Sequence, residues 1–216
     1  MKIAIVGNSK LALTKNYGSF IDTCDVIYRF NNIDLENNEK SLGSRVDIHC
    51  IIGIPSGLIV DSGIHRDPGF NKTLGYLKDC REVWLISPYN TDESKNIALN
   101  FYESIGIKKE KLRFPFTQKN YDNVSTMFFQ FQKELCYTQK ENSSSSGFMI
   151  VNKIVNESSE EDEIYLLGFD FIFCEGVKNY SHAFDLKRTD FGNHPLATEG
   201  LIMIRYMFQK KLFFLI

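Results

Sequence analysis

Short runs of apolar residues, many of them β-branched or aromatic, alternate along the chain with longer segments whose apolar positions recur every three to four residues. The short runs predict buried strands at residues 2–6, 25–30, 45–52, 82–86, 163–167 and 212–215. The longer segments predict helices at residues 11–21, interrupted near Gly18, and at 92–105, 121–135, 148–155 and 195–209. Residues 31–42, 53–70 and 138–146 are predicted to be loops.

This order of elements predicts the fold class. Strands that alternate with helices form a mainly parallel sheet with helices on both faces. We therefore expect one Rossmann-like α/β domain over residues 1–216. Open sheets of this kind bind ligands at the carboxyl ends of their strands. That rule directs attention to residues 7–9, Asn31, residues 145–147 and the segment after Gly168.

The amino-acid composition limits the classes of binding partner and the cellular compartment to be expected. The 216 residues carry 25 Lys and Arg against 27 Asp and Glu, so the basic footprint of a duplex nucleic-acid binder is absent from the sequence. The five cysteines contain no CxxC pair, and neither a zinc site nor a disulfide framework is predicted. Without a recognisable signal peptide or membrane-length apolar stretch, we expect a cytoplasmic protein. The C-terminal KKLFFLI predicts a last buried strand, and peripheral contact with the inner face of a membrane stays open as the alternative.

Two polar clusters stand where elements are predicted to end or begin. Gly7, Asn8 and Ser9 follow the first strand, where a tight turn exposes backbone N–H groups and Asn8 offers an amide to a phosphate or a base. The cluster is neither GxGxxG nor a Walker A loop, so an ordinary turn is an equal alternative. The SSG at residues 145–147 precedes a helix, and its hydroxyl and N–H groups suit a carboxylate or phosphate. A serine-rich linker with an ordinary N-cap is the alternative there.

Several short motifs occur in a fixed order near the N-terminus. They are VGNS at residues 6–9, YG at 17–18, ID at 21–22, DV at 25–26, RFN at 29–31 and GSR at 43–45. This ordered set resembles the large motif of the animal-type sialyltransferase family, and it is far more specific than any one short pattern. The SSG at 145–147, followed by EIYLLGF at 163–169, is similar to the small motif of that family.

Two of the four histidines fall on further motifs of this family. HAFD at residues 182–185 resembles its His-aromatic-aromatic-acid motif, with alanine in place of the first aromatic. His194 and Glu199 match its very small motif, in which Glu follows His by five positions. His49 and His65 match no motif and are interpreted as structural.

The chain also departs from the animal members. It shows no membrane anchor, no stem and no cysteine in the first strand for the disulfide that joins the two large motifs. Residues 53–140 match no motif of the family. The sequence therefore resembles a short, microbial relative of the family, and the segments GFDF and AFD are also similar to Campylobacter-type bacterial sialyltransferases.

The resemblance implies a GT-A-like sialyltransferase variant of the fold and transfer of sialic acid, or a related acid sugar, from CMP to an acceptor hydroxyl. The family inverts the anomeric centre in one displacement. The resemblance also implies that His194 is the base, that His182 stabilises the leaving phosphate, and that Glu199 supports the site. The residues it places on the donor are Asn8, Ser9, Asn31, Ser145, Ser146, Gly147 and Gly168.

The same resemblance implies the partners. These are a CMP-sugar donor and an oligosaccharide or glycolipid acceptor. No cofactor and no metal are expected, because CMP carries a single phosphate and the sequence contains no DxD. Two alternatives stay open: a transferase for CMP-Kdo or another CMP-sugar, and a non-catalytic CMP-binding protein. The acid sugar, the linkage and the oligomeric state are left open as well.

Overall fold

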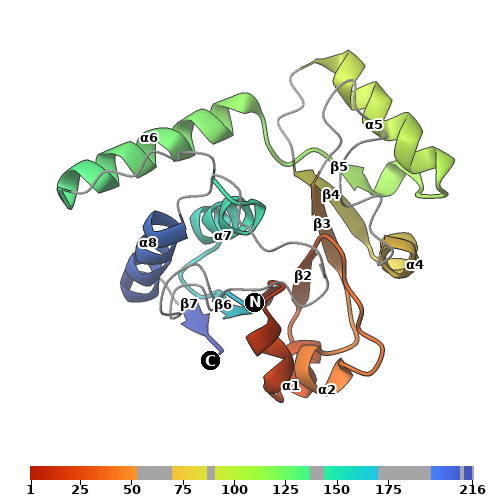
Figure 1. Ribbon diagram of the computed structural model, residues 1–216, viewed down its shortest axis with the longest axis horizontal. Helices are drawn as coiled ribbons and strands as arrows, with labels where there is room; N and C mark the ends of the chain where they lie inside the picture. The colour runs from red at the N-terminus through yellow and green to blue at the C-terminus, as the bar shows by residue number, and fades with distance from the viewer. Residues whose placement is uncertain (53–69, 87–90, 137–143, 170–195, 210–211, 216) are drawn as a thin grey trace.

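Parallel strands form the centre of the molecule (Figure 1). The computed structural model describes residues 1–52, 70–86, 91–136, 144–169, 196–209 and 212–215. Within these residues the strands are β1 (Lys2–Val6), β2 (Val26–Phe30), β3 (Ile48–Ile52), β4 (Glu82–Ile86), β5 (Leu112–Arg113), β6 (Glu163–Leu167) and β7 (Leu212–Phe214). Each neighbouring pair is parallel, in the order β5-β4-β3-β2-β1-β6-β7.

Helices cover both faces of this sheet, as predicted (Figure 1). They are η1 (Lys10–Thr14), α1 (Gly18–Asp22), α2 (Glu39–Leu42), α4 (Phe70–Asp79), α5 (Asp92–Ser104), η2 (Lys109–Lys111), α6 (Gln118–Glu134), α7 (Ser146–Glu157) and α8 (Leu196–Gln209). On one face, Ile3 and Ile5 of β1 share a core with α6, α7 and α8. On the other face, Ala4 and Val6 pack with α1 and α2, while α4 and α5 cover the far strands. The predicted α/β class is confirmed.

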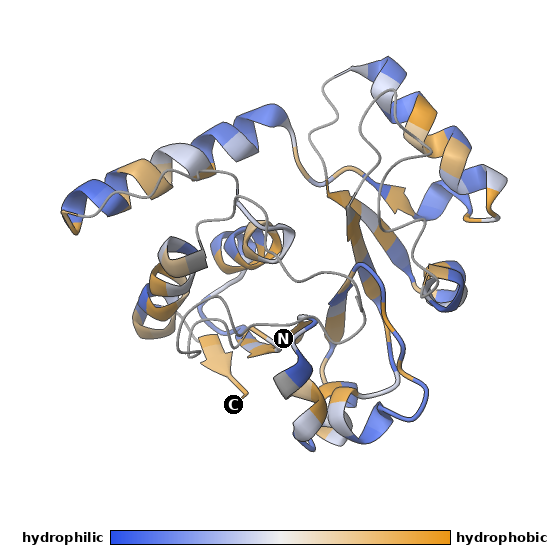
Figure 2. Ribbon diagram, viewed as in Figure 1, coloured by the Kyte–Doolittle hydropathy of each residue, from blue (hydrophilic) through white to orange (hydrophobic). Residues whose placement is uncertain are grey.

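The burial of the strands explains why their sequences are so uniformly apolar. A parallel sheet covered on both faces favours apolar residues at successive positions rather than an alternation of apolar and polar ones. Figure 2 shows the strands coloured mainly as hydrophobic, whereas most helices carry one hydrophobic and one hydrophilic side. Helix α7 lies between α6, α8 and the sheet, and its apolar side buries Phe148–Val151, Ile154 and Val155.

The strand order reverses direction at β1. The chain runs outward from β1 through β2, β3, β4 and β5, and then returns to place β6 on the other side of β1. The carboxyl ends of β1 and β6 therefore flank the topological switch point, where sheets of this type bind their ligands. Residues 7–9 follow β1, and Gly168 follows β6. Two predicted motif segments thus meet at the expected place.

Some predicted elements need correction. Helix α4 begins at Phe70, the end of a stretch predicted to be loop, and the short helix α2 lies within the predicted loop 31–42. The two-residue strand β5 was not predicted. The predicted helix 11–21 is in fact the 3₁₀ helix η1 and the separate helix α1. Strand β7 is confirmed but lies at the sheet edge, where Leu212 is buried and Phe213 exposed.

Strands β1 and β6 approach each other closely where both end. The Gly7 N–H donates to the Leu167 carbonyl at 2.7 Å. A Cβ atom on Gly7 would lie 2.5 Å from the Gly168 oxygen, and one on Gly168 would lie 2.5 Å from the Gly7 oxygen. Gly168 also has a φ of +76°, in the left-handed region that glycine adopts most readily. Neither position has room for a side chain.

Replacement of Gly168 with alanine is therefore expected to lower the free energy of unfolding by about 2–4 kcal/mol, since strain and a backbone clash add. Urea unfolding followed by circular dichroism measures this change. Gly75→Ala is the control, because a Cβ on Gly75 in α4 meets nothing within 4 Å. That variant should be unchanged or stabilised by up to about 1 kcal/mol. Equal losses at both glycines would contradict the close approach of β1 and β6.

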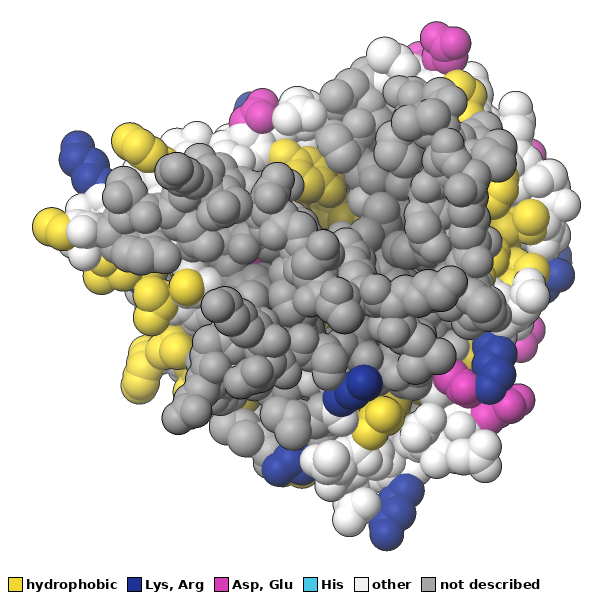
Figure 3. All heavy atoms as spheres, in the orientation of Figure 1, with side chains coloured by type: hydrophobic (Ala, Val, Ile, Leu, Met, Phe, Trp, Pro, Cys, Tyr) yellow, Lys and Arg dark blue, Asp and Glu magenta, His cyan; other side chains and the backbone are white. Residues whose placement is uncertain are grey.

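The surface over α6 and α8 carries several large apolar side chains. Figure 3 shows apolar atoms gathered on the left side of the molecule, where these two helices lie in Figure 1. The exposed residues are Phe129 and Leu135 at α6 and Leu201, Met207 and Phe208 on α8. Among the helices of the described residues, none has the length and apolar character needed to cross a membrane.

Candidate functional site

The ring of Phe169 links the two predicted motif segments at the switch point. A Cβ atom on Gly147, in the first turn of α7, would lie 2.9 Å from Cε1 of this ring. A Cβ atom on Gly7 would lie 3.1 Å from its Cε2. The ring also packs edge-on against Phe30 at the end of β2, with centroids 6.1 Å apart. The large and small motifs are therefore in contact, and the glycines at both positions leave room for the ring.

The side-chain amide nitrogen of Asn8 donates its hydrogen bonds to other groups of the protein. Nδ2 donates to the Phe30 carbonyl at 2.8 Å and to the Asn32 carbonyl at 3.1 Å, and the side chain is buried. These bonds account for both N–H donors of the amide, so a ligand contact by this side chain falls to Oδ1, which is an acceptor. Ser9 is buried as well, and its carbonyl accepts a hydrogen bond from the Ala12 N–H at 3.2 Å.

Asn31 stands at the carboxyl end of β2 in a left-handed conformation, with a φ of +49°. Asparagine tolerates this region better than most residues. Its N–H donates to the Cys50 carbonyl at 2.8 Å, and its own carbonyl lies 2.7 Å from Nε2 of His49. Both main-chain groups of Asn31 are thus bonded to β3, and its side chain is half-buried at the edge of the site.

Glu199 joins the first turns of α7 and α8. Ser145 is the N-cap of α7, and its Oγ accepts from the Phe148 N–H at 3.1 Å. The same hydroxyl donates to Oε2 of Glu199 at 2.6 Å, while the Ser145 N–H donates to Oε1 at 2.5 Å. Glu199 is fully buried in the first turn of α8. The structure therefore brings together two predicted site residues that are 54 positions apart.

These bonds change what Ser145 can offer a ligand. Its hydroxyl is already bonded to Glu199 and to the N–H of Phe148. The N–H groups of Ser146 and Gly147 have no intrahelical partner, because they lie in the first turn of the twelve-residue helix α7. Such N–H groups and the positive end of the helix favour an anion. Within the predicted cluster, the groups available to an anion are therefore the N–H groups of Ser146 and Gly147.

The buried position of Glu199 has an electrostatic consequence. Burial raises the pKa of its carboxyl group to about 7, although the two hydrogen bonds from Ser145 act in the opposite direction. Near neutral pH both the carboxylate and the protonated acid are therefore populated. The protonated acid can donate to the Ser145 hydroxyl and still accept from the Ser145 N–H.

Other residues of the large motif hold the fold. The buried guanidinium of Arg29 donates to the Arg45 carbonyl at 2.8 Å and to the Leu42 carbonyl at 2.6 Å. Burial lowers its pKa to about 10, so it stays charged at neutral pH. The Asp22 carboxylate accepts from the N–H groups of Ser44 and Arg45. The side chains of Asp22 and Arg29 are thus bonded to residues 42–45 and hold the fold rather than a ligand.

Three of the four histidines lie outside the described residues. They are His65 and the two predicted catalytic histidines, His182 and His194. Glu199, five positions after His194, is the part of the very small motif that the structure places. His49 is buried beside Asn31, a position that sequence patterns did not connect with the site.

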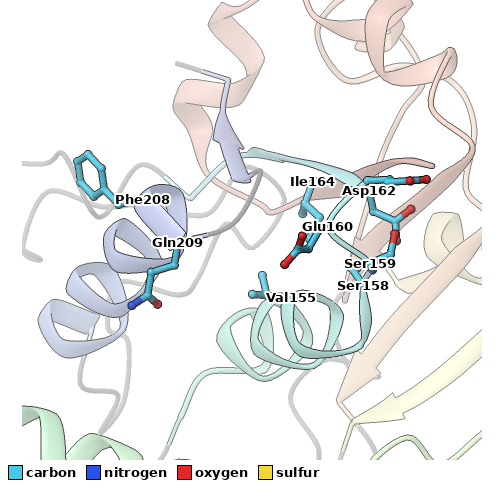
Figure 4. A pocket seen from close by; sticks show the side chains of 9 residues that line it. Val155, Ser158, Ser159, Glu160, Asp162, Ile164, Phe208 and Gln209 are labelled. Atoms are coloured by element: carbon cyan, nitrogen blue, oxygen red, sulfur yellow. The ribbon is translucent and has the colours of Figure 1, made fainter.

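A separate cavity of about 580 Å³ opens between the ends of α7 and α8 (Figure 4). It adjoins the amino end of β6, whereas Gly168 follows the carboxyl end, about 16 Å away along a five-residue strand. None of the predicted site residues that the structure describes lines it. Its lining residues are Val155, Ser158, Ser159, Glu160, Glu161, Asp162, Ile164, Phe208 and Gln209.

A parallel sheet with a glycine-lined switch point, next to the N-terminus of a helix, has the features of a nucleotide-binding α/β protein. The comparison with known families is more specific. The chain belongs to glycosyltransferase family 29 (sialyltransferase), whose pattern matches residues 1–210. The family inferred from the short motifs is therefore confirmed.

Solved structures support the fold. A mammalian sialyltransferase in complex with Gal-beta-1-3GalNAc-ortho-nitrophenol superimposes with a TM-score of 0.64 and 19% sequence identity, covering 99% of this chain and 68% of that one. Another crystal structure of a mammalian sialyltransferase gives a TM-score of 0.63 and 16% identity with the same coverage. At this identity the likeness establishes the shared fold.

One curated relative matches over a shorter segment. It is the beta-1,6-galactosyltransferase GALT29A of Arabidopsis thaliana, which is 39% identical over 51 residues. That segment covers 24% of this chain and 13% of the relative, so this chain matches only a small part of the plant protein. The named sugar of this relative is galactose.

Proposed function

We propose that the protein is a glycosyltransferase that moves sialic acid, or a related acid sugar, from a CMP-sugar to a hydroxyl of an oligosaccharide or glycolipid. The observation that carries this proposal is the contact of the large and small motif segments around Phe169, at the switch point of a family 29 fold. Ligands of open α/β sheets bind at such points. The family supplies the donor class, and the local chemistry supports it.

The described residues offer complementary groups to a CMP-sugar. The N–H groups of Ser146 and Gly147 and the positive end of α7 suit the phosphate or the sugar carboxylate. Oδ1 of Asn8 is an acceptor and would pair with an amino or hydroxyl group of the nucleotide rather than with its phosphate. The side chain of Asn31 lies at the same edge of the sheet and is proposed as a further nucleotide contact.

The proposed reaction is a single displacement. The acceptor oxygen attacks the anomeric carbon as His194 removes its proton, and the bond from that carbon to the phosphate oxygen breaks. The bonding electrons leave with CMP, and His182 stabilises the charge that develops on its phosphate. Attack opposite the leaving group inverts the anomeric centre. The two histidine roles, the inversion and a metal-independent step are parts of the proposal.

A galactosyltransferase is the second candidate, because the plant relative that shares 51 residues with this chain is named for galactose. The alternatives within the CMP-sugar class are CMP-Kdo and other CMP-sugars, and the alternative outside catalysis is a CMP-binding protein. The CMP-sugar transferases all release CMP and differ in the donor that they accept, whereas a galactosyltransferase would release UDP and a binding protein would release no nucleotide.

Incubation with CMP-sialic acid, CMP-Kdo and UDP-galactose, each with a panel of glycan acceptors and with or without EDTA, separates these candidates. We expect acceptor-dependent release of CMP from CMP-sialic acid that persists in EDTA. UDP release would identify the galactosyltransferase, and binding of CMP without release from any donor would identify a binding protein. Complete loss of transfer in EDTA would reject the metal-independent step.

Asn31→Ala is expected to weaken CMP binding by about 1–3 kcal/mol, because a polar group of the nucleotide loses its partner. Isothermal titration calorimetry with CMP in EDTA measures this change. Asn37→Ala is the matched control, because Asn37 is exposed and also has a positive φ, of +64°. It carries the same backbone strain without the ligand contact. Equal weakening in both variants, or equal wild-type affinity for CMP and UMP, would count against this pocket.

A further inference from the structure

The turn at residues 30–32 is held by two buried side chains, those of Asn8 just after β1 and of His49 in β3. Nδ2 of Asn8 donates to the carbonyls of Phe30 and Asn32. The carbonyl between them, that of Asn31, lies 2.7 Å from Nε2 of His49. Three consecutive carbonyls are therefore bonded to side chains, and the middle one depends on His49.

His49 is placed for this bond by the register of the sheet. In the pairing of β2 with β3, His49 is aligned with Arg29, two residues before Asn31. The main-chain N–H of Asn31 donates to the carbonyl of Cys50, a bond that any residue at position 50 would accept. The bond to the Asn31 carbonyl requires a side-chain donor at position 49. Of the two hydrogen bonds between Asn31 and β3, the one made by His49 is therefore the one that depends on the type of residue present.

The protonation state of the ring is fixed by its surroundings. His49 is fully buried, and burial lowers its pKa to about 4, with a further contribution from the nearby charge of Arg29. The ring is therefore neutral at physiological pH and carries one proton. A carbonyl oxygen only accepts, so that proton is on Nε2.

The second ring nitrogen, Nδ1, indicates that His49 does more than fill space in the core. Among the described residues, His49 Nδ1 has no hydrogen-bond partner, although it is buried. A buried polar atom without a partner lowers stability, whereas an apolar side chain at the same position would avoid that loss. What histidine adds here is the bond from Nε2 to the Asn31 carbonyl.

We propose that His49 is a positioning residue for the nucleotide, which holds the Asn31 carbonyl through Nε2–H and so orients the Asn31 side chain toward the switch point. This proposal rests on the proposed function, because Asn31 is a donor contact only if the protein binds CMP. His49 itself touches no ligand. Its effect passes through the left-handed conformation of Asn31.

Two amide substitutions test the bond. The side chain of Gln places its amide nitrogen near the position of His Nε2, whereas Asn places it near Nδ1, which cannot reach the Asn31 carbonyl. We expect His49→Asn to raise the dissociation constant for CMP about tenfold and His49→Gln to stay within about threefold of wild type. Calorimetry measures both, and circular dichroism melting confirms that each variant is folded.

A third variant tests whether the effect passes through Asn31. In an Asn31→Ala background, His49→Asn should weaken CMP binding by less than about twofold more, because the side chain it orients is gone. If wild type binds CMP and His49→Asn binds it equally well, the proposed function stands and the role of His49 is rejected. Additive losses in the double variant reject it too. If wild type does not bind CMP, the proposed function is rejected, and the nucleotide-positioning role with it.

Discussion

Glu199→Leu is expected to lower the free energy of unfolding by about 2–4 kcal/mol and to reduce transfer about 10–100-fold. The carboxyl group of Glu199 accepts both the N–H and the hydroxyl of Ser145, the residue that caps α7. Leucine leaves both donors without that acceptor. It also releases the first turn of α8 from the first turn of α7. Chemical unfolding and initial rates of CMP release measure the two effects.

Glu199→Gln removes the charge of the side chain but keeps its shape and its ability to form hydrogen bonds. Its amide oxygen can still accept from the Ser145 N–H, and its NH₂ group can donate to the Ser145 oxygen, so a loss of about 1 kcal/mol or less is expected. Glu157→Gln on α7 is the control for removal of a carboxylate, because Glu157 is exposed and pairs with Lys153 at the surface. Losses of similar size in Glu199→Leu and Glu157→Gln would contradict a structural role of the buried carboxyl group.

The pH dependence of the stability of wild type and Glu199→Gln gives an independent check on the buried carboxyl group. The pKa of Glu199 is about 7 in the folded chain and has an ordinary value of 4.5 when exposed, so the folded state binds the proton more tightly. The Glu199 carboxyl group makes its full contribution to the free energy of unfolding below about pH 4.5, and this contribution is lost as the pH rises through 7. The unfolding free energy of wild type minus that of Glu199→Gln should therefore be larger at pH 5 than at pH 8. A constant difference would show that burial does not raise this pKa.

The sheet was predictable because local sequence determines most of it. Strands β1, β4 and β6 are short apolar runs flanked by glycine or polar residues, and each was predicted with its observed bounds. Helix α4 was missed because it follows a Gly- and Pro-containing stretch and its buried face consists of Phe70, Thr73 and Leu77, in which threonine weakens the apolar pattern. The four residues of α2 and the two of β5 are too short to show a period.

The sequence placed several candidate site residues at the ends of strands and helices, but it did not show which bonds their side chains make. The motif order placed Asn8, Ser145 and Gly168 at strand and helix ends, and the structure agrees with those positions. What the side chains bond to depends on sheet order and on contacts between distant segments. The Asn8 amide and the Ser145 hydroxyl are therefore used inside the protein, a result that spacing cannot reveal. The contact of His49 with Asn31 likewise depends on the pairing of β2 with β3.

Replacement of His194 with alanine is expected to have the largest effect on the reaction, a loss of transfer of about 10²–10⁴-fold with CMP affinity within about threefold of wild type. The proposed base acts on the acceptor hydroxyl and not on the nucleotide, so binding of CMP should persist. His194 lies two positions before Leu196, the first residue of α8, and Glu199 fixes that helix against α7. Rates of CMP release and calorimetry with CMP measure the two quantities.

Two further variants make this result specific to His194. His182→Ala should lower both the rate and the affinity for CMP, since the proposed partner of His182 is the phosphate. His65→Ala is the matched control, because His65 falls on none of the family motifs. Transfer by wild type should rise with pH through a pKa near neutrality, as a histidine base requires. If His194→Ala keeps transfer within about threefold between pH 6 and 8, another group removes the proton, and the very small motif contributes Glu199 as a positioning residue without a base.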